Sequence, residues 1–488
     1  MQKIKNMMPR VVWFTVFLVT FGSCTSDFEE INKDPNNPVQ VPTAYLLSSA
    51  QQNLMKEIFG MGTTTGKDVG GMRIMQMWSS TLYTDEDRYV DIESDFYTIY
   101  QGGLADLIEL IRLNTDQSTA IAASKSGPNQ NQIAVARIMK AWTFQQITDV
   151  WGDVPYSQAL SGLNHPTPVY DKQSVIYADL IKELDEATAQ IDVSAGNIEG
   201  DIIYDGDMAS WKLFAQSLKL RIGMRLSEVN PELSARTVKQ AISSGVFTSN
   251  DHIAAFSYQS AQPNYSTWYH YYFVGTPTLA VATTLIDRLK ELGDPRISAY
   301  AKIPENGGDY RGIPYGVSAS TAASINNKNV SFPSLRILKA DAEMVIMSYA
   351  EILFVQAEAA ARGWISGDAS TLYKAAITAS MQYWGVSDAN IDAYLAKPAV
   401  GYNVANYRKS IGDQKWLAFY MQGLEAWAEW RRLDFPALLP APDAANGRAI
   451  PRRRGYPLLE ISLNKENYAA AIASQGPDVL ETHVWWDK

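Results

Sequence analysis

Apolar residues recur at helical spacing along most of this 488-residue chain. The clearest example has the i, i+3, i+4, i+7, i+11 pattern of one buried helical stripe and consists of Trp211, Phe214, Ala215, Leu218 and Ile222. Asp207 lies just upstream and is suited to cap that helix. Similar spacing indicates helices through 135–142, 346–360, 369–384 and 415–433. The sequence therefore predicts a mainly all-α fold.

The predicted helices form pairs that are rich in Ala, Tyr and Trp and are joined by short turns containing glycine. Such pairs resemble tetratricopeptide-type hairpins, although no strict period of about 34 residues is visible. Two regions do not fit helices, 245–275 and 300–335. Because long loops in a compact domain often carry function, we expect residues 43–488 to form a single helical domain whose loop-rich insertions present a ligand surface.

The N-terminus has the layout of a secretory signal over residues 1–23. A basic start is followed by an apolar run, Val11–Phe21, and by two small residues. Eleven residues at about 1.5 Å each cannot cross a hydrocarbon core of about 30 Å. FGSC at 21–24 resembles a bacterial lipobox, which implies cleavage before Cys24 and acylation of that cysteine, for example with palmitate. The alternative is an ordinary signal with a coincidental cysteine.

Residues 24–42 are polar and rich in Asp, Asn and Pro, which predicts a flexible, extended tether behind the lipid. Its acidic start, Asp27, Glu29 and Glu30, resembles the signals that send some Bacteroidetes lipoproteins to the cell exterior. A solvated charge cluster is the alternative interpretation.

Charge and cysteine content exclude several classes of function. The formal charge is −10, and removing the three basic residues of the signal makes it −13, which disfavours a nucleic-acid partner. The single cysteine leaves no possibility of an intramolecular disulfide. The four histidines have no zinc-type spacing, so we predict neither a metal site nor a cofactor, although bound calcium is left open.

The 13 Trp and 26 Tyr residues are the most unusual part of the composition. The run NYSTWYHYYF at 264–273 is too aromatic to bury on one face of a strand or a helix. Exposed rings of this kind can stack on sugar rings while polar neighbours bind hydroxyl groups. We therefore predict that this run contains five ligand-binding residues: Asn264, Trp268, Tyr269, Tyr271 and Tyr272. The alternative is that these side chains pack against the helical body.

A second aromatic segment, 75–97, contains six carboxylates as well as Trp78 and Tyr89. The acidic residues lack the turn glycine of an EF-hand and are best interpreted as a solvated face. We predict that Trp78 and Tyr89 contribute a second wall to the binding surface.

No residue suggests itself as a catalyst. The sequence has no nucleophile elbow, P-loop or HExxH motif, and no Ser/His/Asp arrangement is apparent. The protein is therefore predicted not to be an enzyme. A glycosidase-type carboxylate pair cannot be judged by counting acidic residues.

Nine segments in order along nearly the whole chain resemble the SusD/RagB outer-membrane lipoproteins of Bacteroidetes. They include FEEINKDPNNP after Cys24, KAWTFQQITDVWGDVPYSQAL at 140–160, YAEILFVQAEAAARGWISGD at 349–368 and EAWAEWRRLDFP at 425–436. The resemblance implies tetratricopeptide-like hairpins that face a partner and an irregular region that binds ligand. It also implies an outer-membrane, lipid-anchored protein facing the cell exterior, which acts as the lid of a SusC-like TonB-dependent transporter.

The resemblance leaves the ligand open, because binding residues vary between members of the family. Capture of an oligosaccharide is the leading hypothesis, and capture of a peptide by the same fold is the alternative. A surface glycosidase and a scaffold without a small ligand are further alternatives.

Overall fold

A computed structural model of the protein describes residues 41–59, 67–90 and 94–488. Thr43–Lys488 form one compact unit. The predicted signal peptide, Cys24 and all but the last two residues of the predicted tether lie outside the described residues. Within the described part of the chain, none of the helices combines the length and apolarity that a bilayer crossing requires.

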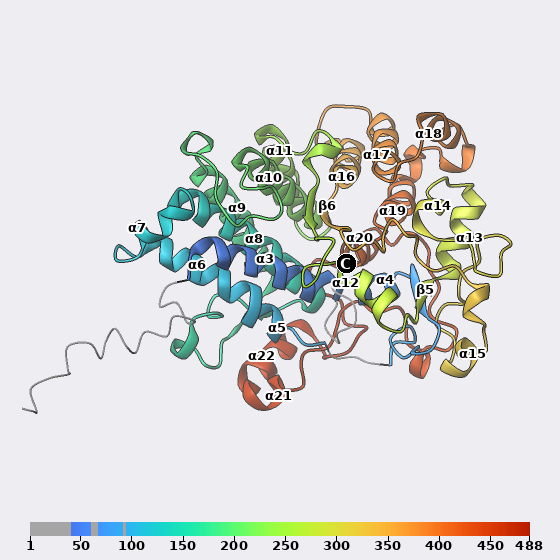
Figure 1. Ribbon diagram of the computed structural model, residues 1–488, viewed down its shortest axis with the longest axis horizontal. Helices are drawn as coiled ribbons and strands as arrows, with labels where there is room; N and C mark the ends of the chain where they lie inside the picture. The colour runs from blue at the N-terminus through green and yellow to red at the C-terminus, as the bar shows by residue number, and fades with distance from the viewer. Residues whose placement is uncertain (1–40, 60–66, 91–93) are drawn as a thin grey trace, which may run out of the picture. The chain divides into compact units, whose positions relative to one another are not determined.

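Helices dominate this unit, as predicted (Figure 1). The first half contains α3 (Thr43–Phe59), α4 (Lys67–Ile74), α5 (Tyr97–Ile99), α6 (Ala105–Thr115), α7 (Ala120–Ala123), α8 (Asn129–Trp151), α9 (Gln173–Gln190), α10 (Met208–Arg225) and α11 (Pro231–Ser244). The second half contains α12 (Thr267–Tyr269), α13 (Thr283–Leu292), α14 (Ile297–Tyr300), α15 (Ala319–Ala323), α16 (Tyr349–Ala361), α17 (Ala369–Tyr383), α18 (Asp388–Leu395), α19 (Tyr407–Ala418), α20 (Gly423–Leu433), α21 (Glu460–Leu463) and α22 (Lys465–Gln475).

Consecutive helices pack as pairs, and the pairs pack on one another. The pairs are α8 with α9, α10 with α11, α16 with α17 and α19 with α20. Helix α10 also contacts α9 and α16, which joins the two halves of the chain. The predicted cap is present, since the Asp207 carboxylate accepts from the backbone N–H groups of Ala209 and Ser210 at 3.0 and 3.2 Å.

The helix predicted over 415–433 is in fact two helices, α19 and α20, separated at 419–422. Met421 adopts a φ of +73°, which no right-handed helix can contain. Helix α4 approaches the start of α20 closely, and a Cβ on Gly71 would lie 2.5 Å from the backbone carbon of Gly423. The break brings Tyr420 and Gln422 to the wall of a cavity described below.

The strands are short and pair in three antiparallel ribbons: β1 (Trp78–Ser80) with β5 (Leu279–Val281), β2 (Val154–Pro155) with β3 (Tyr170–Asp171), and β4 (Ala254–Ser257) with β6 (Glu343–Met347). In the first ribbon Trp78 lies opposite Val281, and in the third Phe256 lies opposite Met344. The regions expected to be irregular contain only short elements. Residues 245–275 include β4, α12, a short 3-10 turn and the π-helical turn His270–Val274, and residues 300–335 include α15 and a 3-10 turn.

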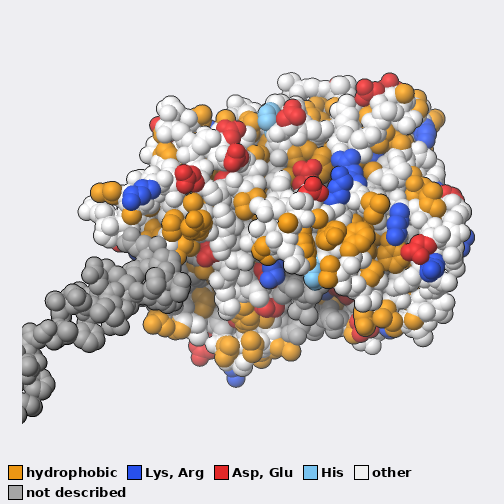
Figure 2. Space-filling view, in the orientation of Figure 1, with side chains coloured by type: hydrophobic (Ala, Val, Ile, Leu, Met, Phe, Trp, Pro, Cys, Tyr) orange, Lys and Arg blue, Asp and Glu red, His pale blue; other side chains and the backbone are white. Residues whose placement is uncertain are grey.

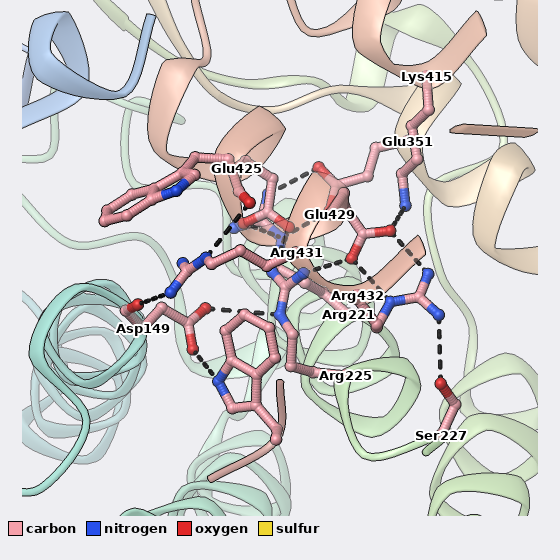
Figure 3. A network of polar contacts seen from close by, with 12 residues as sticks. Asp149, Arg221, Arg225, Ser227, Glu351, Lys415, Glu425, Glu429, Arg431 and Arg432 are labelled. Atoms are coloured by element: carbon pink, nitrogen blue, oxygen red, sulfur yellow. Dashed lines mark hydrogen bonds and ion pairs between the residues drawn. The ribbon is translucent and has the colours of Figure 1, made fainter. Parts of the chain in front are cut away.

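A buried charge network connects the helix pairs (Figure 3). Its members are Asp149 of α8, Arg221 and Arg225 of α10, Glu351 and Glu358 of α16, Lys415 of α19, and Glu425, Glu429, Arg431 and Arg432 of α20. Arg432 forms a two-pronged contact with Glu358 at 2.6 and 2.5 Å and also reaches Glu429 at 2.7 Å. Near the C-terminus, the Trp486 indole N–H donates to Asp149 at 2.8 Å. The network fixes how α8, α10, α16, α19 and α20 sit against each other.

Two carboxylates of this network, Glu358 and Glu429, have cations directly beside them. Burial alone would raise the pKa of Glu358, but the adjacent Arg432 outweighs burial and holds that pKa below its ordinary value. Glu429 behaves in the same way, with Arg432 and Lys415 lowering its pKa. Both carboxylates therefore stay ionised inside the protein.

We expect Glu358 to stabilise the fold at neutral pH and to lose this effect in acid. Its pKa is lower in the folded than in the unfolded protein, so its contribution is complete above the unfolded value near 4.5 and decreases as pH falls toward the folded value. Urea unfolding of the wild type and Glu358→Gln between pH 7 and 3.5 measures this contribution. The stability difference between them should shrink below about pH 4.5; a difference independent of pH would contradict the assignment.

Candidate functional site

A cavity of about 520 Å³ opens where β6, the end of α17 and the break between α19 and α20 meet. Trp268 of α12 also contributes to its wall. The volume lies within the range of about 300–1,000 Å³ that is typical of small-molecule sites. Four segments far apart in the sequence therefore build one concave surface.

The cavity has a charged mouth and a largely apolar interior. The exposed members of its lining include Arg336, Lys339, Asp341 and Glu343, two bases and two acids. The buried members are mostly apolar or aromatic: Trp268, Ile337, Ala342, Met344, Val345, Ala350, Ala379, Trp384, Ala418 and Tyr420. Because the charges at the mouth balance, the site is not built for a strongly charged ligand.

A cluster of aromatic rings supports the interior of the cavity. Tyr300 stacks on Tyr420 with ring centroids 4.3 Å apart. Trp384 lies edge-on to Tyr300, with ring centroids 4.8 Å apart. Trp78 meets Trp268 edge-on at 4.8 Å and donates its indole N–H to the Tyr420 hydroxyl at 2.8 Å. These contacts hold the cavity-lining rings in fixed orientations.

Arg336 lies across the aromatic pair at the end of α17. Its guanidinium carbon is 5.5 Å from the ring of Tyr383 and 5.3 Å from the ring of Trp384. The same group donates a hydrogen bond to the Tyr383 carbonyl oxygen. A cation over two rings is a favourable contact, and here it fixes the half-buried Tyr383 at the edge of the cavity.

Three of the predicted ligand-binding residues are buried. Trp78 is 0% exposed, Tyr89 is 1% exposed and Trp268 is 1% exposed. Trp78 lies beneath the cavity as part of the supporting cluster, whereas Tyr89 accepts from the Ala441 backbone N–H at 3.2 Å and is not among the cavity residues. In this structure Trp78 and Tyr89 offer no accessible ring face to a ligand, and Trp268 contributes only to the cavity wall.

The remaining residues of the predicted platform are partly exposed. Tyr271 and Tyr272 use their hydroxyl groups inside the protein, with Thr278 at 2.7 Å and with the Leu279 carbonyl at 2.5 Å. The Asn264 side chain accepts from Gln52 at 3.1 Å. Their part in ligand binding stays a prediction.

An aromatic ridge extends from α12 beside Trp268 and consists of Tyr265, Tyr269, His270 and Phe273. The ring of Tyr269 lies 5.4 Å from that of Tyr265 and 5.1 Å from that of Phe273, and His270 stacks on Tyr265 at 5.9 Å. Phe273 is 53% exposed. Figure 2 shows hydrophobic side chains gathered around α12 on this face, with acidic and basic groups next to one another above them. The predicted aromatic run therefore does provide exposed rings.

Several cavity residues were not predicted from the sequence: Arg336, Tyr383, Trp384 and Gln422. A signal for two of them was present, because the helix predicted over 369–384 ends in adjacent aromatic residues before Gly385. Of these two rings, Tyr383 is half-buried at the edge of the cavity and Trp384 is buried in its wall. For Arg336 and Gln422 the sequence contains no comparable signal.

The described residues contain no group of three or more His, Cys, Asp or Glu side chains that could hold a metal ion. The lipidation site Cys24 lies outside the described residues.

A family model described as "Starch-binding associating with outer membrane" matches residues 35–457. The chain belongs to this SusD-like family. Curated proteins provided no match. Solved structures similar to this SusD-like protein cover nearly all of its compact unit. One, a chitin-binding protein, is 28% identical over 91% of this chain and 99% of its own, with a TM-score of 0.78.

A SusD homologue from Bacteroides fragilis is 23% identical over 92% of this chain and 100% of its own, with a TM-score of 0.78. A chitin-binding SusD homologue from Flavobacterium johnsoniae is 22% identical over 91% of this chain and 98% of its own, with a TM-score of 0.74. These two structures show the shared fold. The match of the family model confirms the membership of the SusD-like family that the nine sequence segments predicted.

Proposed function

We propose that this SusD-like protein captures an oligosaccharide, without catalysis, in the cavity between β6, α17 and the α19–α20 break. The observation that carries the proposal is the cavity itself, whose interior is apolar and aromatic and whose mouth is polar. Sugars combine apolar ring faces with a polar edge, so they suit a site in which aromatic surface and hydrogen-bonding groups lie side by side.

The aromatic ridge gives this site an extension. Three of its four rings, Tyr269, His270 and Phe273, lie on the short helical segment 267–274 that also contains Trp268. Because Trp268 lines the cavity, a glycan chain longer than the cavity could continue along these rings. The chitin-binding relative at 28% identity and the family's description as starch-binding support a glycan rather than another class of nutrient.

The setting of this capture follows from the family and from the sequence. We infer that the mature chain begins at an acylated Cys24 and faces the cell exterior from the outer membrane. There it passes its ligand to a SusC-like TonB-dependent transporter, with the tether allowing it to move as a lid. The family's description as outer-membrane associated supports the location, and the lipobox-like FGSC supports the lipid anchor at Cys24. The transporter and the lid-like movement rest on the family resemblance.

The site can be tested by removing one ring at its edge. Tyr383→Ala should weaken binding of a captured polysaccharide about tenfold, which corresponds to about 1.4 kcal/mol, because it removes a ring face and frees Arg336. Affinity electrophoresis in gels containing soluble polysaccharides measures this loss as reduced retardation.

Two controls accompany this variant. Tyr383→Phe keeps the ring and should be retarded like the wild type, and Tyr45→Ala removes a 68% exposed ring from α3, outside the cavity lining. If Tyr383→Ala and Tyr45→Ala bind like the wild type, the glycan site lies elsewhere.

A further inference from the structure

The mouth of the cavity contains four exposed charged side chains that the protein does not pair. They are Arg336, Lys339, Asp341 and Glu343. Within the described part of the chain, none of them forms an ion pair. Elsewhere on the surface, opposite charges that lie close together do pair, as Lys290 does with Asp309 at 2.6 Å. The charges at the mouth are therefore available to a ligand.

Arg336 is held in place by contacts that leave most of its donors free. Its guanidinium carbon lies 5.5 Å from the ring of Tyr383 and 5.3 Å from that of Trp384, and one Nη group donates to the Tyr383 carbonyl. A Cβ on Gly385 would lie 3.1 Å from the other Nη atom, so the glycine leaves room for this arrangement. The remaining N–H groups can bind a ligand from a side chain that is already ordered.

Glu343 occupies the one exposed rung of the ribbon formed by β4 and β6. It lies directly opposite Ser257, and every other residue of these two strands is buried. Both side chains line the cavity, and neither has a hydrogen-bond partner among the described residues. The strand pairing thus fixes the backbone of Glu343 while its carboxylate stays free.

Arg336 and Glu343 lie near the same cavity-lining ring without pairing with each other. Burial raises the pKa of Tyr383, Glu343 raises that pKa further, and Arg336 lowers it, so both charges act on this side chain from nearby. The stacked rings hold one charge and the strand holds the other. A ligand that offers both a donor and an acceptor can bridge them.

Two adjacent hydroxyl groups of a sugar match this arrangement. Because a hydroxyl group both donates and accepts, one can donate to the Glu343 carboxylate while its neighbour accepts from Arg336. Hydrogen bonds to charged groups are about twice as strong as those between neutral groups. The apolar face of the same sugar then lies against the mostly apolar interior.

We propose that Arg336 and Glu343 together bind two adjacent hydroxyl groups of one sugar ring, so that the cavity selects glycans whose sugars carry a free vicinal diol. This inference rests on the proposed glycan-capturing function of the same cavity. It adds the chemical class of the sugar and the two residues that determine specificity.

Affinity electrophoresis of the full mature chain, in gels that each contain one soluble polysaccharide, tests the inference. Backbone sugars carry two adjacent free hydroxyl groups in soluble starch, dextran and galactomannan. In laminarin and glycol chitin they do not, because the glycosidic linkage at C3 or the acetamido group at C2 removes one of the pair. We expect the wild type to bind at least one of the first three at least about tenfold more tightly than either of the last two.

Single variants assign this preference to the two residues. Glu343→Ala and Arg336→Met should each weaken binding of the preferred polysaccharide about tenfold. Because both groups hold the same diol, the double variant should lose less than the product of the two single losses. Neither side chain has an ion pair to lose, so the thermal midpoints should stay close to that of the wild type.

The control variant is Glu466→Ala, an exposed acidic residue of α22 outside the cavity lining, which should bind like the wild type. Retardation by laminarin or glycol chitin as strong as that by the diol-bearing polysaccharides would overturn the diol assignment and leave glycan capture standing. A preference that is unchanged in Glu343→Ala or in Arg336→Met would overturn the role of that residue. Absence of retardation by all five polysaccharides would overturn the inference together with glycan capture.

Discussion

Arg432→Leu is expected to lower the free energy of unfolding by about 3–5 kcal/mol, a large part of the stability of a typical protein. Arg432 is fully buried and forms ion pairs with Glu358 at 2.5 Å and Glu429 at 2.7 Å. Removing the guanidinium leaves both carboxylates beside a leucine, away from solvent. Glu358 then keeps only Arg362 at 2.9 Å, and Glu429 keeps Lys415 at 2.6 Å and Arg225. The penalty comes from two buried carboxylates that have each lost a cation more than from the lost attraction itself.

The matched control is Arg112→Leu in α6, where the same chemistry occurs at the surface. Arg112 pairs with Glu109 at 2.6 Å, but both side chains are about half exposed, so its loss should cost only a small fraction of the free energy that Arg432→Leu costs. Urea unfolding of both variants and the wild type gives the loss in free energy of unfolding for each substitution, from the shift of the midpoint at an unchanged m-value. Equal effects of the two substitutions would mean that the network of Figure 3 is not a buried one.

Trp78→Ala is expected to destabilise the protein by about 3–5 kcal/mol, the usual cost of deleting a buried tryptophan. Trp78 is 0% exposed, packs edge-on against Trp268 and donates to Tyr420. Because Trp268 and Tyr420 both line the cavity, the void left by Trp78 should also loosen the wall of the binding site. Glycan affinity should therefore fall together with stability, although Trp78 has no exposed surface.

Trp78→Phe separates volume from hydrogen bonding in this prediction. Phenylalanine restores most of the apolar volume but not the N–H donor, so it should recover most of the stability lost in the alanine variant. A change below about 1 kcal/mol for Trp78→Ala would show that Trp78 is not a core residue and would reopen its role as an exposed ligand contact.

The helical part of the fold could be predicted because periodic apolar spacing is a local property of the chain. Asp207 and the stripe from Trp211 to Ile222 contain nearly all the information that α10 requires. The break at 419–422 could not be predicted in this way. It depends on the close approach of Gly71 to Gly423, which lie more than 300 positions apart, and on a left-handed Met421.

The candidate site was less predictable than the fold. The sequence shows where aromatic residues are numerous but not which of them are buried, so Trp78 and Tyr269 looked equivalent. In the structure Trp78 belongs to the core, whereas Tyr269 lies on the partly exposed ridge. Arg336 and Gln422 join the cavity only because the chain folds back on itself, and neither occurs in a recognisable motif.

The measurement that tests the central claim most directly is isothermal titration of the purified mature protein against a panel of oligosaccharides and short peptides. The account predicts saturable binding of at least one oligosaccharide with a stoichiometry of one, lost or strongly weakened in Tyr383→Ala and retained in Tyr45→Ala. Binding of peptides with no binding of any glycan would contradict the account.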